Sequence, residues 1–447
     1  MLFTFSLPKA GRTKGIILDK TLRSTLYTRP KRHNTSLFFG VITCLLLCSN
    51  TSWANDFAPE WSIKGFGSLS IVGTDTNTIG FYRDRSQAQS IKDNWSVTPD
   101  SRLGIQLGVN FNEALQMTVQ WVARDHAGNF FEQNLEWAFL RWRPQNDLDI
   151  RIGRLGTDVF LSSDYRNVSY AYPWMRPPHE FYGTIPIYHY DGFDIGKRYT
   201  IDNGYLTLKI FAGYSTNQLI SNPGNEIFDF NAPVAGGNVT YEYSNWRTKL
   251  SYVFVHPITD TPGFDKASTL LNDPLVNFGL PGISELTPYL TTKHIDMHFI
   301  SIGSAYDDGV WLIQAEAAYL HSDSPLFPAL TSAYLSLGRR FSSVTLYTLF
   351  GIAHSFAYNI DVPEPVIANT ELQEIHDSIN GFLNQNGIDE TSISLGVRWD
   401  VYSNIALKAQ WSHFWLGQNG TQLWQEFDTE PTPNKVNVWS FGFDFIF

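Results

Sequence analysis

The chain has 447 residues, of which 15% are aromatic and 17% are charged, and its formal net charge is −11. An acidic balance of this size argues against nucleic acid as a partner. Beyond residue 54 the sequence has no apolar run of helix length, which excludes a helical membrane protein.

Residues 1–54 are predicted to be a secretory signal peptide. Residues 37–48 form an apolar run of 12 residues, too short to span a bilayer comfortably. A basic patch at residues 29–32 precedes this run, and Ser52-Trp53-Ala54 follows it as a small-x-small cleavage pattern. Leu47-Cys48 also resembles the end of a lipoprotein signal, although Leu47 stands where a small residue is expected.

Removal of this leader would change the composition of the mature chain, residues 55–447. Both cysteines, Cys44 and Cys48, would leave with it, so the mature chain would need no disulfide in an oxidising compartment. Eight basic residues and one acidic residue would also leave, which moves the net charge from −11 to −18.

Short segments of alternating apolar and polar residues recur along the mature chain. Leu103, Ile105 and Leu107, for example, alternate with Arg102, Gly104 and Gln106. Successive side chains of a strand point to opposite faces, so each segment is predicted to be a strand with one apolar and one polar face. The predicted strands are residues 61–72, 100–111, 114–124, 133–143, 147–154, 190–199, 204–213, 236–243, 246–256, 294–306, 310–320, 329–340, 344–356, 390–401, 404–415 and 435–447.

The connections between these strands are alternately short and long. Short links such as Asp202-Asn203, Ser244-Asn245 and Ser403-Asn404 carry residues typical of tight turns. A soluble two-sheet sandwich would give the same face alternation, but not this alternation of link lengths. The pattern predicts an all-β fold: a transmembrane antiparallel β-barrel of about 16 strands, with long external loops and short periplasmic turns.

Residues 155–189, the third long connection, are the candidate constriction loop. This connection supplies Asp158, Asp164, Arg166 and Glu180 as candidate charges on one side of a channel. The polar strand faces supply candidate channel-lining residues on the other side: Arg102, Arg124, Arg151, Arg247, Lys249, Arg398 and Lys408. Arg or Lys on a lipid-facing surface near the bilayer midplane would cost ~2–4 kcal/mol, so these basic side chains are expected to face inward.

Four later connections, residues 214–235, 257–293, 357–388 and 416–434, hold 14 acidic residues and only two lysines. They predict a strongly negative external mouth. Leu372, Ile375 and Ile379 recur at helical spacing, so the 357–388 connection is predicted to contain a helix.

The C-terminal strand has one wholly aromatic face, which carries Phe441, Phe443, Phe445 and Phe447 together with Trp439. A barrel in lipid needs an apolar exterior and a last strand that pairs with the first. A terminal Phe preceded by alternating aromatic residues resembles the assembly signal of bacterial outer-membrane barrels.

The chain as a whole resembles the general porins of Gram-negative bacteria. The resemblance rests on the strand pattern, on Gly153-Arg154 at a strand end and on the long connection that follows. In that family the third loop folds into the barrel and narrows the pore. The Pro-rich stretch at residues 172–178 departs from the family's usual acidic tip, which leaves room for a specialised porin of the phosphate-selective kind.

The resemblance implies a passive diffusion channel for ions and small hydrophilic solutes in the outer membrane. It also implies a homotrimer, contacts with outer-membrane lipid and lipopolysaccharide, and delivery to the barrel-assembly machinery. No catalytic cluster, metal-ligand spacing or cofactor motif is found in the sequence. The alternatives are an outer-membrane enzyme of the phospholipase or protease kind, or a structural or adhesive barrel with a plugged lumen. Glycines on the polar faces, Gly104, Gly108, Gly396 and Gly442, favour open space inside.

Overall fold

A computed structural model of the chain describes residues 59–185, 187–220, 226–261, 264–324, 326–356, 358–384, 387–426 and 433–447. The predicted signal peptide, residues 1–54, lies outside the described residues. Among the described helices, none is both long enough and apolar enough to cross a membrane.

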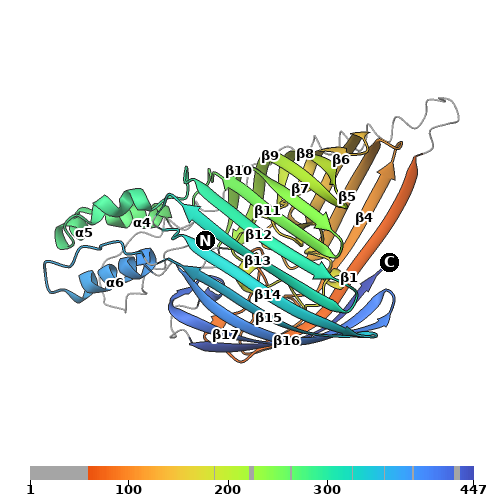
Figure 1. Cartoon of the computed structure of the whole chain (residues 1–447). Coiled ribbons are helices and arrows are strands. Elements are labelled where there is room, and N and C mark those ends of the chain that lie inside the picture. The colour runs from red at the N-terminus through yellow and green to blue at the C-terminus, as the bar shows by residue number, and fades with distance from the viewer. Residues whose placement is uncertain are drawn as a thin grey trace. The chain divides into compact units, whose positions relative to one another are not determined.

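In the described part of the chain, 16 antiparallel strands form one closed barrel (Figure 1). Each strand pairs with the next in sequence, and the first strand closes the ring by pairing with both the second and the last. The barrel strands are β1 (Glu60–Thr74), β4 (Arg102–Asn110), β5 (Leu115–Arg124), β6 (Leu135–Gln145), β7 (Leu148–Gly156), β8 (His189–Ile201), β9 (Gly204–Ile220), β10 (Ile227–Tyr243), β11 (Trp246–Val255), β12 (Met297–Asp307), β13 (Trp311–Ser322), β14 (Leu330–Phe341), β15 (Val344–Ser355), β16 (Ile388–Tyr402), β17 (Ile405–Thr421) and β19 (Lys435–Ile446).

The remaining elements lie in the connections. Two-residue strands β2 (Ile79–Gly80) and β18 (Gln425–Glu426) pair with each other, and β3 (Trp95–Ser96) pairs with β1. The helices are α2 (Phe130–Gln133), η3 (Ser163–Tyr165), η4 (Ser169–Ala171), α3 (His179–Tyr182), α4 (Phe264–Leu271), α5 (Pro274–Gly279), η5 (Ile283–Tyr289) and α6 (Thr370–Asn384).

All 16 predicted strands are confirmed, but the predicted loop at residues 214–235 is wrong, and β17 extends to Thr421 into the predicted loop at residues 416–434. Residues 214–235 were expected to form one of the long links, and their Pro233 is a poor strand former. Instead, β9 and β10 continue as a long hairpin whose ladder ends at Ile220 and Ile227. Pro233 is tolerated because it lies beyond Val234, where the pairing of β10 with β11 ends. The inward-facing Phe228 and Phe230 continue the alternation of the strand below them.

The two faces of the barrel differ as the alternation predicts. Outward-facing positions carry large apolar side chains that are exposed, among them Ile63, Leu103, Ile152, Ile302 and Leu395. A row of exposed aromatic residues follows the short-turn end, as an aromatic girdle does at a membrane interface: Trp61, Trp142, Tyr205, Trp246, Trp311, Phe341, Trp399 and Tyr402. The buried positions of the strands carry many polar and charged side chains beside an apolar cluster.

The short turns suit their residues. Asp202, Ser244 and Ser342 each begin a two-residue turn and have positive φ angles of 50°, 53° and 55°. Two-residue hairpin turns need such left-handed backbone, which matches the twist of the flanking strands. Small polar residues reach this conformation at lower cost than β-branched ones, so the turn positions could be found from the sequence.

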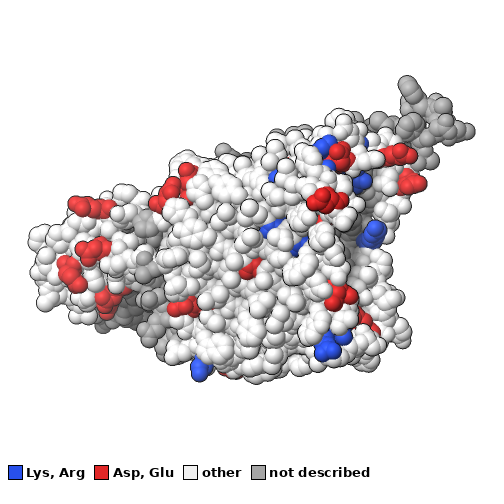
Figure 2. Space-filling view, in the orientation of Figure 1, with Lys and Arg blue, Asp and Glu red and all other residues white. Residues whose placement is uncertain are grey.

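Helices α4, α5, η5 and α6 form a lobe at the long-loop end (Figure 1). Apolar side chains from the lobe share one buried cluster, which includes Phe264, Leu280, Ile283 and Ile379. Asp273 caps α5 by accepting hydrogen bonds from the backbone N–H groups of residues 275 and 276. The predicted helix in the 357–388 connection is confirmed as α6. Figure 2 shows acidic side chains gathered over this lobe.

Candidate functional site

The connection between β7 and β8, residues 157–188, lies among the inward-facing side chains of the barrel; we call it the interior segment. Lys408, on β17, holds one part of it. The buried Lys408 ammonium donates to the carbonyl oxygens of Ser169 at 2.6 Å, Tyr172 at 2.7 Å and Trp174 at 2.8 Å. It also forms an ion pair of 2.9 Å with Asp444 on β19. A lysine with three such acceptors and a carboxylate is a fixed anchor rather than a free charge.

Other strands hold the interior segment in the same way. On β14, Ser336 accepts a hydrogen bond of 2.7 Å from the indole N–H of the fully buried Trp174. Across the lumen on β13, the carboxylate of Glu316 accepts from the backbone N–H of Leu161 at 2.8 Å and from the hydroxyl of Tyr182 at 2.7 Å. The segment therefore crosses the lumen and is bound to several walls.

Arg398, a predicted channel-lining residue on β16, also contacts the interior segment. Its Nη1 donates to the carbonyl oxygens of Tyr170 at 2.6 Å and Tyr172 at 3.1 Å, and its guanidinium lies 4.6 Å from the centre of the Tyr170 ring. Its Nε donates to Asp400 at 2.8 Å. Like Lys408, Arg398 uses much of its donor capacity on the backbone of the segment.

Asp158, the second residue of the interior segment, forms ion pairs with two wall lysines, Lys209 on β9 and Lys249 on β11. Asn238 on β10 donates to its carbonyl oxygen at 2.9 Å. Burial opposes ionisation of this carboxyl, but the two lysines outweigh burial and hold the pKa of Asp158 well below its usual range. The predicted residues Asp158 and Lys249 thus meet directly, instead of facing each other across open space.

A charged cavity of about 460 Å³ extends from Asp158 toward the short-turn end. Strands β6 to β11 form its walls, and the exposed Asp164 of the interior segment borders it. Arg151 donates from Nε to both oxygens of Asp194, at 2.9 and 3.0 Å. Arg247 also lines the cavity, so five of the predicted residues, counting Asp158 and Lys249, share this vestibule.

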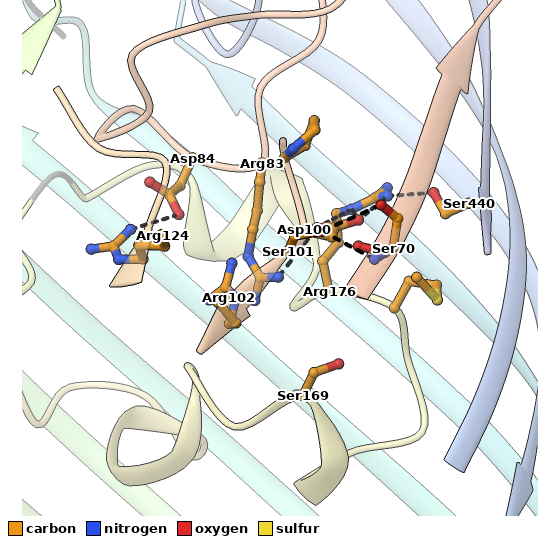
Figure 3. A network of polar contacts seen from close by, with 12 residues as sticks. Ser70, Arg83, Asp84, Asp100, Ser101, Arg102, Arg124, Ser169, Arg176 and Ser440 are labelled. Atoms are coloured by element: carbon orange, nitrogen blue, oxygen red, sulfur yellow. Dashed lines mark hydrogen bonds and ion pairs between the residues drawn. The ribbon is translucent and has the colours of Figure 1, made fainter. Parts of the chain in front are cut away.

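Three further predicted residues, Arg102, Arg124 and Arg166, face a second and much smaller cavity together with Arg83. Figure 3 shows Arg83 beside Arg102, and Arg124 paired with Asp84. Asp100 lies beside this cluster and receives hydrogen bonds from Arg83 and from Arg176 of the interior segment. Burial opposes ionisation of Asp100, but Arg176 and then Arg83 lower its pKa.

Glu180 is separated from the other predicted residues. It lies on α3 with an exposed fraction of 1%, and its Oε1 is buried without a hydrogen bond. Burial, and then the nearby carboxylate of Glu390 on β16, together raise the pKa of Glu180 to about 7. Glu390 itself contacts Nδ1 of His179 at 3.1 Å. Glu180 therefore belongs to a buried acidic pair and does not border the charged vestibule.

The inward glycines do not mark open space. A Cβ atom on Gly104 would lie 2.2 Å from the ring of Phe66, and one on Gly396 would lie 2.1 Å from the ring of Tyr347. Gly442 makes room for the side chain of Met175 in the interior segment, and Gly108 faces the Ser62 hydroxyl. These glycines accept neighbouring side chains at close range, which overturns the expectation of open space above them.

Several charged residues of the interior escaped sequence analysis. Five of those on strands alternate with apolar neighbours and could have been found from that alternation: Glu136, Asp194, Lys209, Glu316 and Asp444. Glu390 stands between Asp389 and Thr391 and lacks this signal. Arg83 and Arg176 lie in connections and have no periodic signal that would reveal them, whereas Asp100 continues the polar face of the predicted strand 100–111.

A closed barrel of 16 strands with an apolar outer face, an aromatic girdle and a charged interior is an outer-membrane β-barrel. Its structure is similar to those of Gram-negative outer-membrane porins. No protein-family model matches the chain, and no curated protein matches its sequence.

The similarity is to solved structures of low sequence identity. The anion-selective porin from Comamonas acidovorans matches with a TM-score of 0.49 and 10% identity over 87% of this chain and 100% of that one. OmpF of Salmonella typhi, in complex with daunomycin, matches with a TM-score of 0.49 and 11% identity over 87% of this chain and 97% of OmpF. OmpT of Vibrio cholerae matches with a TM-score of 0.48 and 12% identity over 88% of this chain and 99% of OmpT.

Proposed function

We propose that this barrel is a channel for passive diffusion of ions and small hydrophilic solutes across the outer membrane. The observation that supports this proposal most is the vestibule of about 460 Å³, because its lining is charged and polar. Apolar walls would exclude water, whereas walls such as Arg151, Asp194 and Arg247 keep it. A barrel of 16 strands is also of the size at which natural barrels enclose an aqueous lumen.

The interior segment is the proposed constriction. A pore wide enough for hydrated solutes selects by size and by charge at its narrowest point. Asp158 and Asp164 of the segment and Lys249 and Arg247 of the wall would supply that charge where the vestibule ends. The anchors at Lys408 and Glu316 would keep the constriction fixed.

Recording single-channel currents in planar bilayers tests the proposal. Wild-type protein is expected to conduct, and deletion of residues 165–180 is expected to raise the conductance and relax solute exclusion. Deletion of residues 265–280 in the lobe removes the same number of residues from another connection and serves as the control. A wild-type barrel that carries no current would overturn the proposed function, while equal conductance in the two deletions would show that the segment is not the constriction.

One observation favours a second candidate function, a structural or adhesive barrel with a plugged lumen. The interior segment buries Phe160, Trp174 and Phe181 against the wall in a large apolar cluster, which is the packing expected of a plug. The same recordings separate the two functions, because a plugged barrel carries no current until the segment is deleted.

We also propose, from the resemblance to general porins, that the protein is a homotrimer in contact with lipopolysaccharide and that the barrel-assembly machinery inserts it. We propose a transport role in preference to catalysis. Native mass spectrometry of the detergent-extracted protein tests the trimer, and a monomer alone would contradict it.

A further inference from the structure

Two arginines inside the barrel have no carboxylate within ion-pair distance among the described residues. Arg102, the first residue of β4, is buried and donates from Nη1 to the side-chain oxygen of Asn167 at 3.1 Å. Arg166 of the interior segment donates to the carbonyl oxygen of Tyr188 at 2.8 Å and lies over its ring. Removing a guanidinium from water without a counter-charge is costly, so the excess positive charge needs compensation.

Both arginines line one cavity of about 30 Å³, which Arg83 and Arg124 also line. The four side chains come from three separate parts of the chain: the connection before β4, the facing ends of β4 and β5, and the interior segment. Figure 3 shows three of them, Arg83, Arg102 and Arg124. A cavity that holds water needs at least ~10–15 Å³, so this one has room for roughly two water molecules or one compact ion.

Two of the arginines that line the cavity carry a donor without an acceptor. The Nε atoms of Arg102 and Arg124 are both buried, and neither makes a hydrogen bond with the described residues. Both side chains are more than nine-tenths buried. A buried N–H without an acceptor loses its hydration and gains nothing in return. Two such groups, on two arginines that line the same small cavity, point to a missing acceptor.

The neighbouring carboxylates are already engaged. Asp100 pairs with Arg83 at 3.2 Å and with Arg176 at 2.6 Å, and Glu136 pairs with Arg124 at 3.2 Å.

Asp84, the only carboxylate among the residues that line the cavity, is also engaged. It accepts a hydrogen bond from the hydroxyl of Tyr188 at 3.1 Å and lies 3.7 Å from Arg124. The cluster therefore sets five arginines against three carboxylates, which leaves two positive charges uncompensated.

We propose that this cavity is a binding site for a compact monoanion, either a halide ion or the carboxylate group of a small solute. Such an anion would give the Nε atoms of Arg102 and Arg124 the acceptor that they lack, and it would offset the excess charge. Its use as a stop for anions that cross the barrel rests on the proposed channel function, but binding itself does not.

Crystals of the protein grown in bromide test the site directly. An anomalous peak is expected in the cavity bounded by Arg102, Arg124 and Arg166. Water alone in this cavity at high bromide, together with no effect of formate in the titration below, would overturn the proposal. This measurement needs no substitution and no ion flux.

Thermal unfolding of the detergent-solubilised protein gives the affinity. Bromide or formate replaces bulky gluconate at constant ionic strength, and a saturable rise in the unfolding temperature is expected with at least one of them. Saturation with bromide identifies a halide site, and saturation with formate alone identifies a carboxylate site. Arg102→Gln is expected to weaken binding roughly tenfold or more, because a charge-assisted hydrogen bond is lost.

Matched variants keep the test sharp. Arg339→Gln removes the same charge from an arginine that stacks on the Trp311 ring on the outer wall, and it should leave the affinity unchanged. Asp84→Asn removes a competing negative charge and should strengthen binding, which keeps the proposal testable if Arg102→Gln does not fold. If Arg339→Gln weakens anion binding as much as Arg102→Gln does, the effect comes from the overall charge of the protein and the proposed site is overturned.

The outcomes separate this proposal from the channel function. A protein that binds bromide but carries no current would refute the channel and leave the site in place. A conducting protein with neither an anomalous peak nor a saturable anion effect would refute the site alone.

Discussion

The ring of Phe447 lies over Gly65, in the space that a side chain at position 65 would need. A Cβ atom on Gly65 would lie 2.1 Å from Cζ of Phe447. The backbones of the two residues also exchange two hydrogen bonds of 2.9 Å. The last residue of the chain thus covers the first strand where the barrel closes, and Phe445 covers Gly67 in the same way.

This contact predicts that the C-terminal aromatic residues determine assembly. Phe447→Asp should lower the amount of folded barrel in the outer membrane, because a charge replaces the ring that covers β1. Gly65→Leu should do so to a smaller extent, since the ring can move aside. Heat-modifiable electrophoretic migration measures the folded fraction, and Phe341→Asp on the same rim is the control. Wild-type amounts of folded Phe447→Asp protein would contradict the prediction.

Replacement of Lys408 should loosen the interior segment. Lys408→Met removes three hydrogen bonds to backbone carbonyl groups and leaves Asp444 buried without its cation. Breaking a buried pair in this way costs ~3–5 kcal/mol. We expect proteolytic cleavage within residues 169–176 of the folded variant, together with noisier and larger currents. Lys435→Met, at the exposed start of β19, is the control, and equal protease resistance in both variants would rule out Lys408 as an anchor.

Glu180 should make stability depend on pH. Burial, and then Glu390, raise its pKa from 4.5 to about 7, so the folded protein binds this proton more tightly than the unfolded chain does. The resulting stabilisation is complete below pH 4.5 and is lost as the pH rises through about 7.

Wild-type protein should therefore lose up to about 3 kcal/mol of unfolding free energy between about pH 4.5 and pH 7 that Glu180→Gln does not lose. Urea titrations of the barrel in lipid vesicles measure the difference. Glu371→Gln on α6 should keep the wild-type dependence. If the unfolding free energies of wild type and Glu180→Gln change with pH in the same way, Glu180 is not the source of the pH dependence.

The acidic connections at the long-loop end should add cation preference at low salt. They hold 14 acidic residues and two lysines, and part of this charge lies on the lobe in Figure 2. Exposed charges are screened within ~8–10 Å at physiological salt, whereas charges that face each other inside a narrow pore are screened less. Reversal potentials across salt gradients at several ionic strengths test this, and cation preference that does not grow on dilution would place these residues away from the pore.

The strands could be predicted because face alternation is a local property. Leu103, Ile105 and Leu107 alternate with polar residues whatever lies across the lumen. The extension of β9 and β10 was not predicted. Its Pro233 is unfavourable in a central strand, and it is tolerated because the pairing of β10 with β11 stops at Val234.

The sequence predicts which side chains of the site face inward, but not which groups they contact. The sequence indicates that Lys249 and Lys408 face inward, but not that one binds Asp158 and the other binds backbone carbonyl groups. Glu180 was expected beside a passage and instead lies against Glu390, which is 210 residues away in the chain. Contacts at such separations depend on how the interior segment threads the barrel, and no local pattern records that path.

The hydroxyl of Ser169 donates to Asp444 at 3.0 Å across 275 residues of chain. A chain that is synthesised from its N-terminus delivers β1 to β7 and the interior segment long before Lys408 and Asp444 exist. During most of translation the interior segment therefore lacks its partners Lys408 and Asp444. A chain that ends before β19 would lack one wall strand and also Asp444, the partner of Lys408. Lys408 would then hold residues 169–174 without a carboxylate beside its ammonium group. The last strand, β19, therefore closes the barrel and also completes the contacts that hold the interior segment.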